Sequence, residues 1–116
     1  MYLDPERVRL EVRQELADQA NIVLVSAVSG YEVSLKHRLG KMPEAGPLLT
    51  NFEPWAAELQ FDLLDVSLAH ALTAGSMDWA HKDPFDRLLV AQALVDDLTL
   101  VSNEKLFRQT GVKLLW

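Results

Sequence analysis

The fold is decided by one stretch, His81-Lys82-Asp83-Pro84-Phe85-Asp86-Arg87-Leu88-Leu89-Val90-Ala91-Gln92-Ala93-Leu94. Asp83 precedes a proline, and proline is tolerated in a first helical turn because its missing N–H would have no partner there. Asp83 therefore predicts an N-cap, and Asp86 falls in the first turn, where a carboxylate suits the positive end of the helix dipole. The apolar residues that follow predict a nearly enclosed helix.

A short buried strand is predicted directly after this helix, at 98–101, and it leads into Ser102, Asn103 and Glu104. Carboxylates at helix starts beside the end of a buried strand are found where α/β sheets bind ions and phosphates. The stretch therefore predicts an ion-binding edge of a sheet, to which other parts of the chain must bring further acids.

The composition predicts a single domain, residues 1–116, with a modest core. No apolar tract is long enough to span a bilayer, and the charged N-terminus is unlike a signal peptide. The chain has no cysteine, which excludes thiolate metal sites and fits a cytoplasmic location. A net charge of −6 argues against a broad electrostatic grip on nucleic acid, but leaves open a local site masked by cations, or a basic partner.

Alternating strands and helices favour a parallel sheet with helices on both faces. We expect strands near 22–25, 61–66, 98–101 and 112–115. The first is expected to be enclosed on both faces because it is a run of β-branched and apolar residues. We expect the other helices at 6–18 (after the start signal Asp4-Pro5-Glu6), from Ser26 or Ser29 to Gly40, at 48–59 with Pro54 starting or kinking its second half, and from Ser67 to Gly75.

Four acids lie at or near helix starts: Glu32, Asp83, Asp86 and Glu104. Taken singly, each is most simply a cap or a partner of the helix dipole. Taken together at one edge of a parallel sheet, they predict an oxygen-rich site for Mg²⁺ or Mn²⁺, ions that prefer carboxylates and water.

Basic residues cluster on the helix of Glu32, where Lys36 and Arg38 are either a solvated face or contacts for phosphates. Arg87 could pair with a nearby acid or with a phosphate, and we expect the acid. The three histidines, His37, His70 and His81, show no metal-ligand spacing and are expected to be surface or helix-packing residues.

Two segments resemble the PIN-domain family. The segment from Val25 to Lys41 resembles the family's second-strand motif, and His81–Ala93 resembles the long-helix motif of its VapC-like toxin branch. Leu98-Thr-Leu-Val-Ser102 and the terminal Gly111–Trp116 resemble that branch too, so the likeness covers essentially the whole chain.

The resemblance implies an α/β/α sandwich around a short parallel sheet, and an Mg²⁺- or Mn²⁺-dependent endoribonuclease. It also implies a toxin role with an RNA substrate, a cognate antitoxin that blocks the site, and a homodimer. By position, Glu32 matches the acid of the second motif and Asp86 the acid that opens the long helix. Glu104 stands where the family usually has Asp, and Asp83 matches a frequent extra acid of the branch, more plausibly a cap.

The chain departs from the family at its start. The family opens with a central strand that ends in a metal-binding Asp, whereas here the chain begins at Asp4-Pro5-Glu6-Arg7, which fits the loop after the family's first helix. We therefore expect a sheet without its central strand, with a gap between the strands at 22–25 and 98–101. We favour a truncated or misassigned N-terminus over a decayed toxin or a gap closed by neighbouring segments.

Two functions follow. In the first, Glu32, Asp86 and Glu104 hold one or two divalent ions for RNA hydrolysis while Lys36 or Arg38 steers the RNA backbone, with activity lowered or lost through the missing acid. In the second, the chain is a non-catalytic PIN-like module that binds an antitoxin or itself, favoured by apolar surface exposed at the gap.

Overall fold

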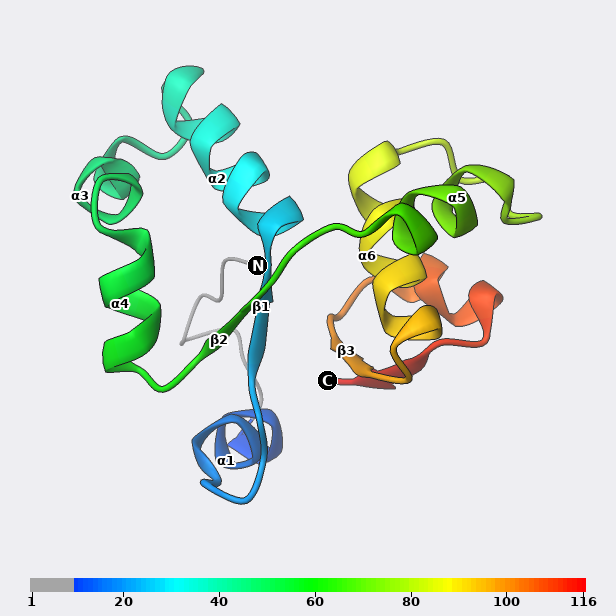
Figure 1. Ribbon diagram of the computed structural model, residues 1–116, viewed down its shortest axis with the longest axis horizontal. Coiled ribbons are helices and arrows are strands. Elements are labelled where there is room, and N and C mark those ends of the chain that lie inside the picture. Colours follow the sequence, from blue (N-terminus) through cyan, green and yellow to red (C-terminus); the bar gives the residue numbers. More distant parts are fainter. Residues whose placement is uncertain (1–9) are drawn as a thin grey trace.

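The computed structural model describes residues 10–116, which form two halves lying side by side (Figure 1). The first half contains α1 (Leu10–Ala17), β1 (Leu24–Ser26), α2 (Ala27–Arg38), the 3-10 helix η1 (Pro43–Ala45), α3 (Gly46–Leu49), α4 (Phe52–Glu58) and β2 (Asp62–Leu64). The second contains α5 (Leu68–Ser76), α6 (Pro84–Val95), β3 (Thr99–Val101), the 3-10 helix η2 (Lys105–Thr110) and β4 (Lys113–Leu115). The expected helix start at Asp4–Glu6 lies outside the described residues.

The strands form two separate parallel pairs. β1 pairs with β2, with Leu24 opposite Asp62, and β3 pairs with β4, with Thr99 opposite Lys113. Within residues 10–116 no ladder joins β1 to β3. The predicted α/β class is confirmed, consistent with a PIN-like α/β/α fold. For the part of the chain that the structure describes, the predicted gap between the strands near 22–25 and 98–101 is also present.

Local expectations needed two corrections. The strand near 22–25 is not enclosed on both faces: Ile22 is 79% exposed and β1 is only half-buried at Leu24 and Val25. Among residues 10–116, β1 pairs with β2 alone, so the side chains beside its other edge are covered only in part. The predicted helix at 48–59 is broken at Thr50–Asn51 into α3 and α4, and Pro54 falls in the first turn of α4, where its missing N–H costs nothing.

Each half buries a small apolar cluster of its own. In the second half, Val90 and Ala93 of α6 pack with Phe107 and Val112, and in the first half Val33 packs with Met42 and Ala45. The prediction for α6 holds for its middle, Val90–Ala93, which is buried, whereas Leu94 is 41% exposed. No helix among residues 10–116 is both long and apolar enough to cross a membrane.

The buried side chain of Gln92 connects the two halves. Ser26, at the end of β1, donates a hydrogen bond from Oγ to Oε1 of Gln92 at 2.5 Å, and Nε2 of Gln92 donates to the carbonyl of Asp65 at 3.3 Å. Nearby, the rings of Tyr31 (α2) and Phe85 (α6) lie 5.0 Å apart between centroids. These contacts set the distance between α2 and α6, the helices that carry Glu32 and Asp86.

Candidate active site

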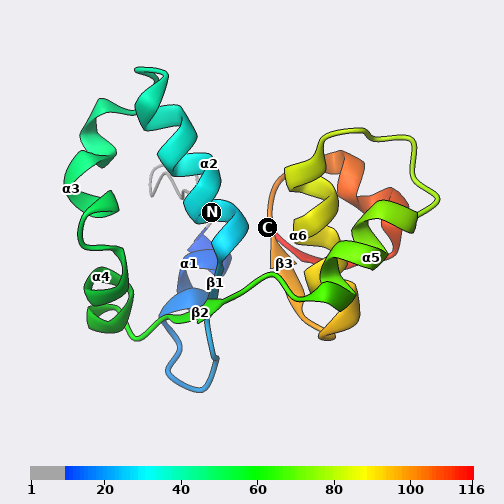
Figure 2. The same cartoon turned by 45° about the horizontal axis from the view of Figure 1, so that its top comes forward.

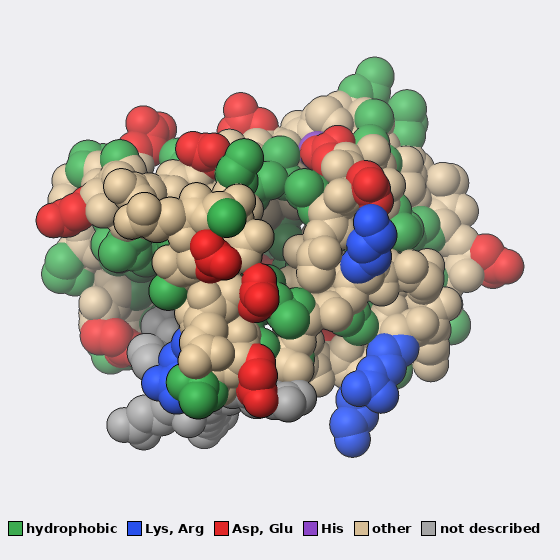
Figure 3. All heavy atoms as spheres, turned by 90° about the horizontal axis from the view of Figure 1, so that it is seen from below, with side chains coloured by type: hydrophobic (Ala, Val, Ile, Leu, Met, Phe, Trp, Pro, Cys, Tyr) green, Lys and Arg blue, Asp and Glu red, His purple; other side chains and the backbone are tan. Residues whose placement is uncertain are grey.

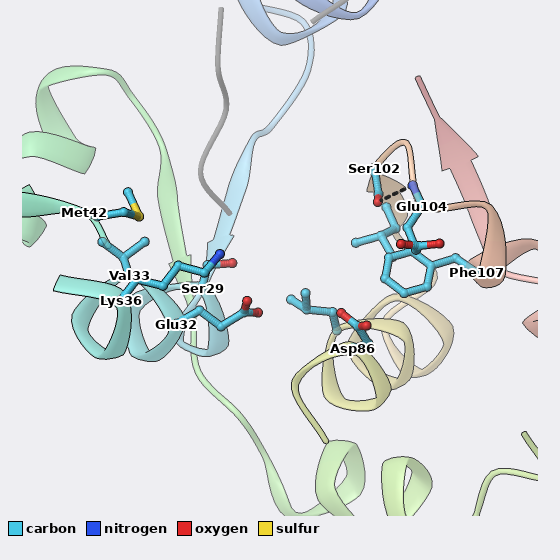
Figure 4. Close-up of a pocket in the computed structure, with 11 residues that line it drawn as sticks. Ser29, Glu32, Val33, Lys36, Met42, Asp86, Ser102, Glu104 and Phe107 are labelled. Atoms are coloured by element: carbon cyan, nitrogen blue, oxygen red, sulfur yellow. Dashed lines mark hydrogen bonds between the residues drawn. The ribbon is translucent and has the colours of Figure 1, made fainter. Parts of the chain in front are cut away.

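A pocket of about 240 Å³ lies between the halves, beyond the carboxyl ends of β1 and β3 (Figure 4). The predicted acids Glu32, Asp86 and Glu104 all line it, although they are far apart along the chain. The remaining lining residues are Ser29, Val33, Lys36, Met42, Leu89, Leu100, Ser102 and Phe107. The position follows from the topology, because parallel strands bring the segments that follow them to one edge.

Glu32 enters the pocket from α2, whose first turn is capped by Ser26 through a hydrogen bond from the N–H of Val28. Figure 4 shows its carboxylate facing that of Asp86 across the pocket. Burial raises the pKa of Glu32 above its ordinary value; Lys36 lowers that pKa, and Asp86 and Asp83 raise it. An acid that is partly desolvated and faces other acids is a good partner for a cation.

Asp86 belongs to a tighter group with His81 and Asp83, whose ligand atoms all lie within 4.8 Å of one another. Nε2 of His81 lies 2.7 Å from Oδ2 of Asp86. Asp83 is the predicted N-cap of α6, because its Oδ1 accepts hydrogen bonds from the N–H groups of Phe85 and Asp86 at 2.9 and 3.3 Å. Asp83 thus caps α6, while the side chains of His81 and Asp86 contact each other beside it.

Arg87 holds the loop that carries His81. Its guanidinium donates to four backbone carbonyls, those of Ala74, Met77, Trp79 and His81, at 2.6–3.0 Å. The expectation that Arg87 pairs with an acid is therefore wrong. The guanidinium has five N–H donors in a fixed fork, and a tight loop supplies enough carbonyl oxygens to engage them.

Glu104 reaches the pocket from the segment after β3. Its N–H donates to Oγ of Ser102 at 3.0 Å, and its carboxylate caps η2 by accepting from the N–H of Leu106 at 3.1 Å. Among residues 10–116, the one group of three or more potential ligands within 4.8 Å is that of His81, Asp83 and Asp86. Glu32 and Glu104 therefore share the pocket with Asp86 but do not form such a compact set with it.

The two predicted RNA-binding residues differ in position. Lys36 lines the pocket one turn after Glu32 on α2, where its ammonium could meet a phosphate. Arg38 is exposed in the last turn of the same helix and does not line the pocket. Lys36 is therefore the better placed of the two for a substrate bound at the acids.

His81 is a possible ligand that its place in the sequence did not indicate. His81, Asp83 and Asp86 are two and three residues apart across a loop and a helix start, a spacing that matches no common metal motif. His81 is brought to Asp86 by the loop that Arg87 holds, and its ring also lies 4.8 Å from that of Trp79 between centroids. The other expectation for the histidines holds for His70, which is buried and pairs with Asp96 at 2.9 Å.

The donors in this pocket suit a hard divalent cation. Carboxylate oxygens and hydroxyls line it, the imidazole of His81 lies beside Asp86 without lining it, and thiolates are absent because the chain has no cysteine. Mg²⁺ and Mn²⁺ favour such oxygen donors, and Mg²⁺ usually keeps several waters, so acids that are not in mutual contact can still share an ion through its water shell.

Comparison with known proteins gives one family match. The family model described as PIN domain matches residues 2–113, nearly the whole chain. The curated proteins and the solved structures compared with the chain give no significant match. The family match, the α/β architecture and the acid-lined pocket agree, and the chain therefore belongs to the PIN-domain family.

Proposed function

We propose that this protein is a metal-dependent endoribonuclease that hydrolyses RNA phosphodiester bonds. PIN domains are generally nucleases that typically bind divalent metal and RNA. The observation that carries the proposal for this chain is the meeting of Glu32, Asp86 and Glu104, from three separate segments, around one pocket.

In this proposal Glu32, Asp86 and Glu104 hold one or two Mg²⁺ or Mn²⁺ ions. When bound, such an ion supplies a more acidic water and neutralises charge on the phosphate. His81 orients the carboxylate of Asp86 through its 2.7 Å contact, and Asp83 caps α6, so that both act on the position of Asp86. Lys36 binds the RNA backbone at the rim, with Arg38 contributing from the exposed end of α2.

Cleavage by this chain should be slow. The resemblance implies a further metal-binding Asp at the end of a central strand, and no strand lies between β1 and β3 among residues 10–116. In this proposal three carboxylates bind the metal where the family has a further Asp. Glu104 is not part of the compact group at Asp86. We expect activity well below that of a complete site.

The proposed biological role is that of a toxin acting on cytoplasmic RNA, neutralised by a cognate antitoxin and assembled as a homodimer. Exposed apolar side chains support a protein partner: Leu68 and Leu72 lie one turn apart on α5 and are 74% and 63% exposed. Exposing apolar side chains to water costs free energy, and a partner that covers them recovers this free energy.

A second candidate is a non-catalytic module that binds an antitoxin or itself. The split sheet favours it, because the two pairs of strands leave open edges between the halves. It differs from the first candidate in one respect that can be measured, namely whether RNA cleavage depends on the pocket acids.

The deciding experiment measures cleavage of a fluorogenic RNA by the intact chain with Mg²⁺, with Mn²⁺ and with a chelator. The nuclease proposal predicts metal-dependent cleavage that falls at least a hundredfold in Asp86→Asn, about 3 kcal/mol of transition-state stabilisation. Glu58→Gln, an exposed acid at the end of α4, is the matched control and should leave the rate unchanged. Equal cleavage by both variants would remove Asp86 from the mechanism.

A further inference from the structure

Ser29 is a buried residue whose hydroxyl has no partner in the described part of the chain. It lies in the first turn of α2, which faces α6 across the space between the halves (Figure 2). Its exposed fraction is 3%, and it lines the acid-lined pocket one turn before Glu32. A serine in a helix often donates to the backbone carbonyl three or four residues earlier. Among residues 10–116 the side chain of Ser29 makes neither that hydrogen bond nor another.

The hydroxyl of Ser29 is open to the pocket. Within residues 10–116, every side-chain nitrogen or oxygen that is shut off from solvent in a non-exposed residue has a hydrogen-bond partner. Because Ser29 has no partner, its Oγ reaches the space of the pocket. Burying most of a polar residue without a partner costs free energy, and a ligand that accepts a hydrogen bond recovers it. The hydroxyl is therefore available to a molecule bound beside Glu32.

Three polar side chains line the pocket from one face of α2. Ser29, Glu32 and Lys36 are three and four residues apart, the spacing that places side chains on the same face of a helix. In Figure 4 the side chain of Lys36 extends back along α2 toward Ser29, the direction in which helical side chains lean. A hydroxyl donor and an ammonium can thus reach one ligand, with a carboxylate between them.

The charges around this face favour an anion as that ligand. Burial raises the pKa of Glu32 and Lys36 lowers it, so the ammonium lies within electrostatic reach of the carboxylate. Lys36 nevertheless takes part in no ion pair among the described residues. Acidic side chains are spread over the face in Figure 3, where only a few basic ones are seen, so an anion finds few other partners there. The first turn of α2 adds the positive end of a helix dipole.

We propose that Ser29 is a substrate-binding residue, which donates a hydrogen bond from Oγ to a non-bridging oxygen of an RNA phosphate held also by the ammonium of Lys36. The inference rests on the proposed function, because it takes an RNA phosphodiester as the ligand. Glu32 lies between the two donors along α2, so the phosphate they hold lies beside a carboxylate proposed to bind the metal. A hydrogen bond to a charged oxygen adds both strength and direction to the contact of Lys36.

The test measures the affinity of a short, fluorescently labelled single-stranded RNA for the intact chain in Ca²⁺, by anisotropy at several salt concentrations. Ser29→Ala should weaken binding at least tenfold, because a hydrogen bond to a charged group is lost. It should leave the slope of log affinity against log salt unchanged, since a hydroxyl releases no counterion, whereas Lys36→Met should weaken binding and lower that slope by about one. Ser34→Ala, the same change at an exposed position of α2 that does not line the pocket, is the matched control and should change neither.

Two further measurements separate binding from folding and from catalysis. Ser29→Ala should keep the urea midpoint of the parent chain, because alanine fits the space of serine and is the better helix former. The double variant with Lys36→Met should lose less affinity than the two single variants together, because both residues hold one phosphate. Equal RNA affinity in Ser29→Ala and Ser34→Ala, or no binding by the parent chain, would overturn the inference. Binding that depends on Ser29 in a chain that does not cleave RNA with Mg²⁺ would uphold it and contradict the proposed nuclease.

Discussion

The two halves of the molecule fix their acids in different ways. In the second half, Asp86 sits on a helix whose N-cap, preceding loop and buried face are all held within that half, by Asp83, by Arg87 and by the cluster around Val90. In the first half, Glu32 sits on a helix that packs on a smaller cluster and follows a half-exposed strand. Asp86 is therefore held mainly within its own half, whereas the helix of Glu32, which has fewer supports there, depends more on the contacts of Ser26 and Tyr31 with α6.

The largest loss of stability should come from Arg87→Met, which removes the support of the loop in the second half. The variant loses four charge-assisted hydrogen bonds to loop carbonyls, and we expect a cost of about 2–4 kcal/mol in the free energy of unfolding. Urea denaturation measures it, with Arg13→Met on the exposed side of α1 as the control. A cost below about 1 kcal/mol would mean that the second half does not depend on this loop.

Gln92→Leu should cause the second-largest loss of stability, because it removes the buried hydrogen bonds that link the halves. Ser26 loses its acceptor and the carbonyl of Asp65 loses its donor, at a cost of about 1–3 kcal/mol. Gln109→Leu, which removes the exposed acceptor of the Trp79 indole N–H, is the matched control and should cost less. Ser26→Ala also removes the cap of α2, so coupling is read from the full cycle: if the double variant loses as much as the sum of the two single variants, the two side chains are not coupled and the proposed link is wrong.

The smallest effect should be a gain in stability for Glu32→Gln without metal. Since the pKa of Glu32 is raised in the folded protein, its ionised form costs stability above that pKa, and the cost disappears below the ordinary value of 4.5, where folded and unfolded states are both protonated. We expect a gain of at most about 0.5 kcal/mol at pH 7 that shrinks as the pH falls, because solvent screens this half-buried group. Denaturation in chelator at several pH values measures it, and a loss of stability at pH 7 would contradict the raised pKa.

Much of the second half could be predicted from local chemistry. Asp83-Pro84 marks the start of α6, and the apolar run after it predicts the buried face, because capping and periodicity are properties of neighbouring residues. The gap beside β1 was also predictable, because the resemblance assigns each strand a place and leaves one place without a strand.

Contacts made through tertiary structure could not be predicted in this way. The partners of Arg87 are carbonyls of an irregular loop, and His81 meets Asp86 only because that loop is folded back. Pro54 indicated a second helical start, but the break itself falls at Thr50–Asn51, where neither residue is a glycine or a proline. For the candidate site, the acids could be named from their positions after strands and at helix starts, but their separation across the pocket depends on how the halves pack.

The most direct test of the account is Mn²⁺ binding measured by titration calorimetry on the intact chain and on Glu32→Gln, Asp86→Asn and Glu58→Gln. If one ion is shared across the pocket by the two halves, Glu32→Gln and Asp86→Asn should each weaken binding at least tenfold, about 1.4 kcal/mol, and Glu58→Gln should not change it. Binding that is lost in Asp86→Asn but unchanged in Glu32→Gln would contradict the account, because the ion would then belong to the second half alone.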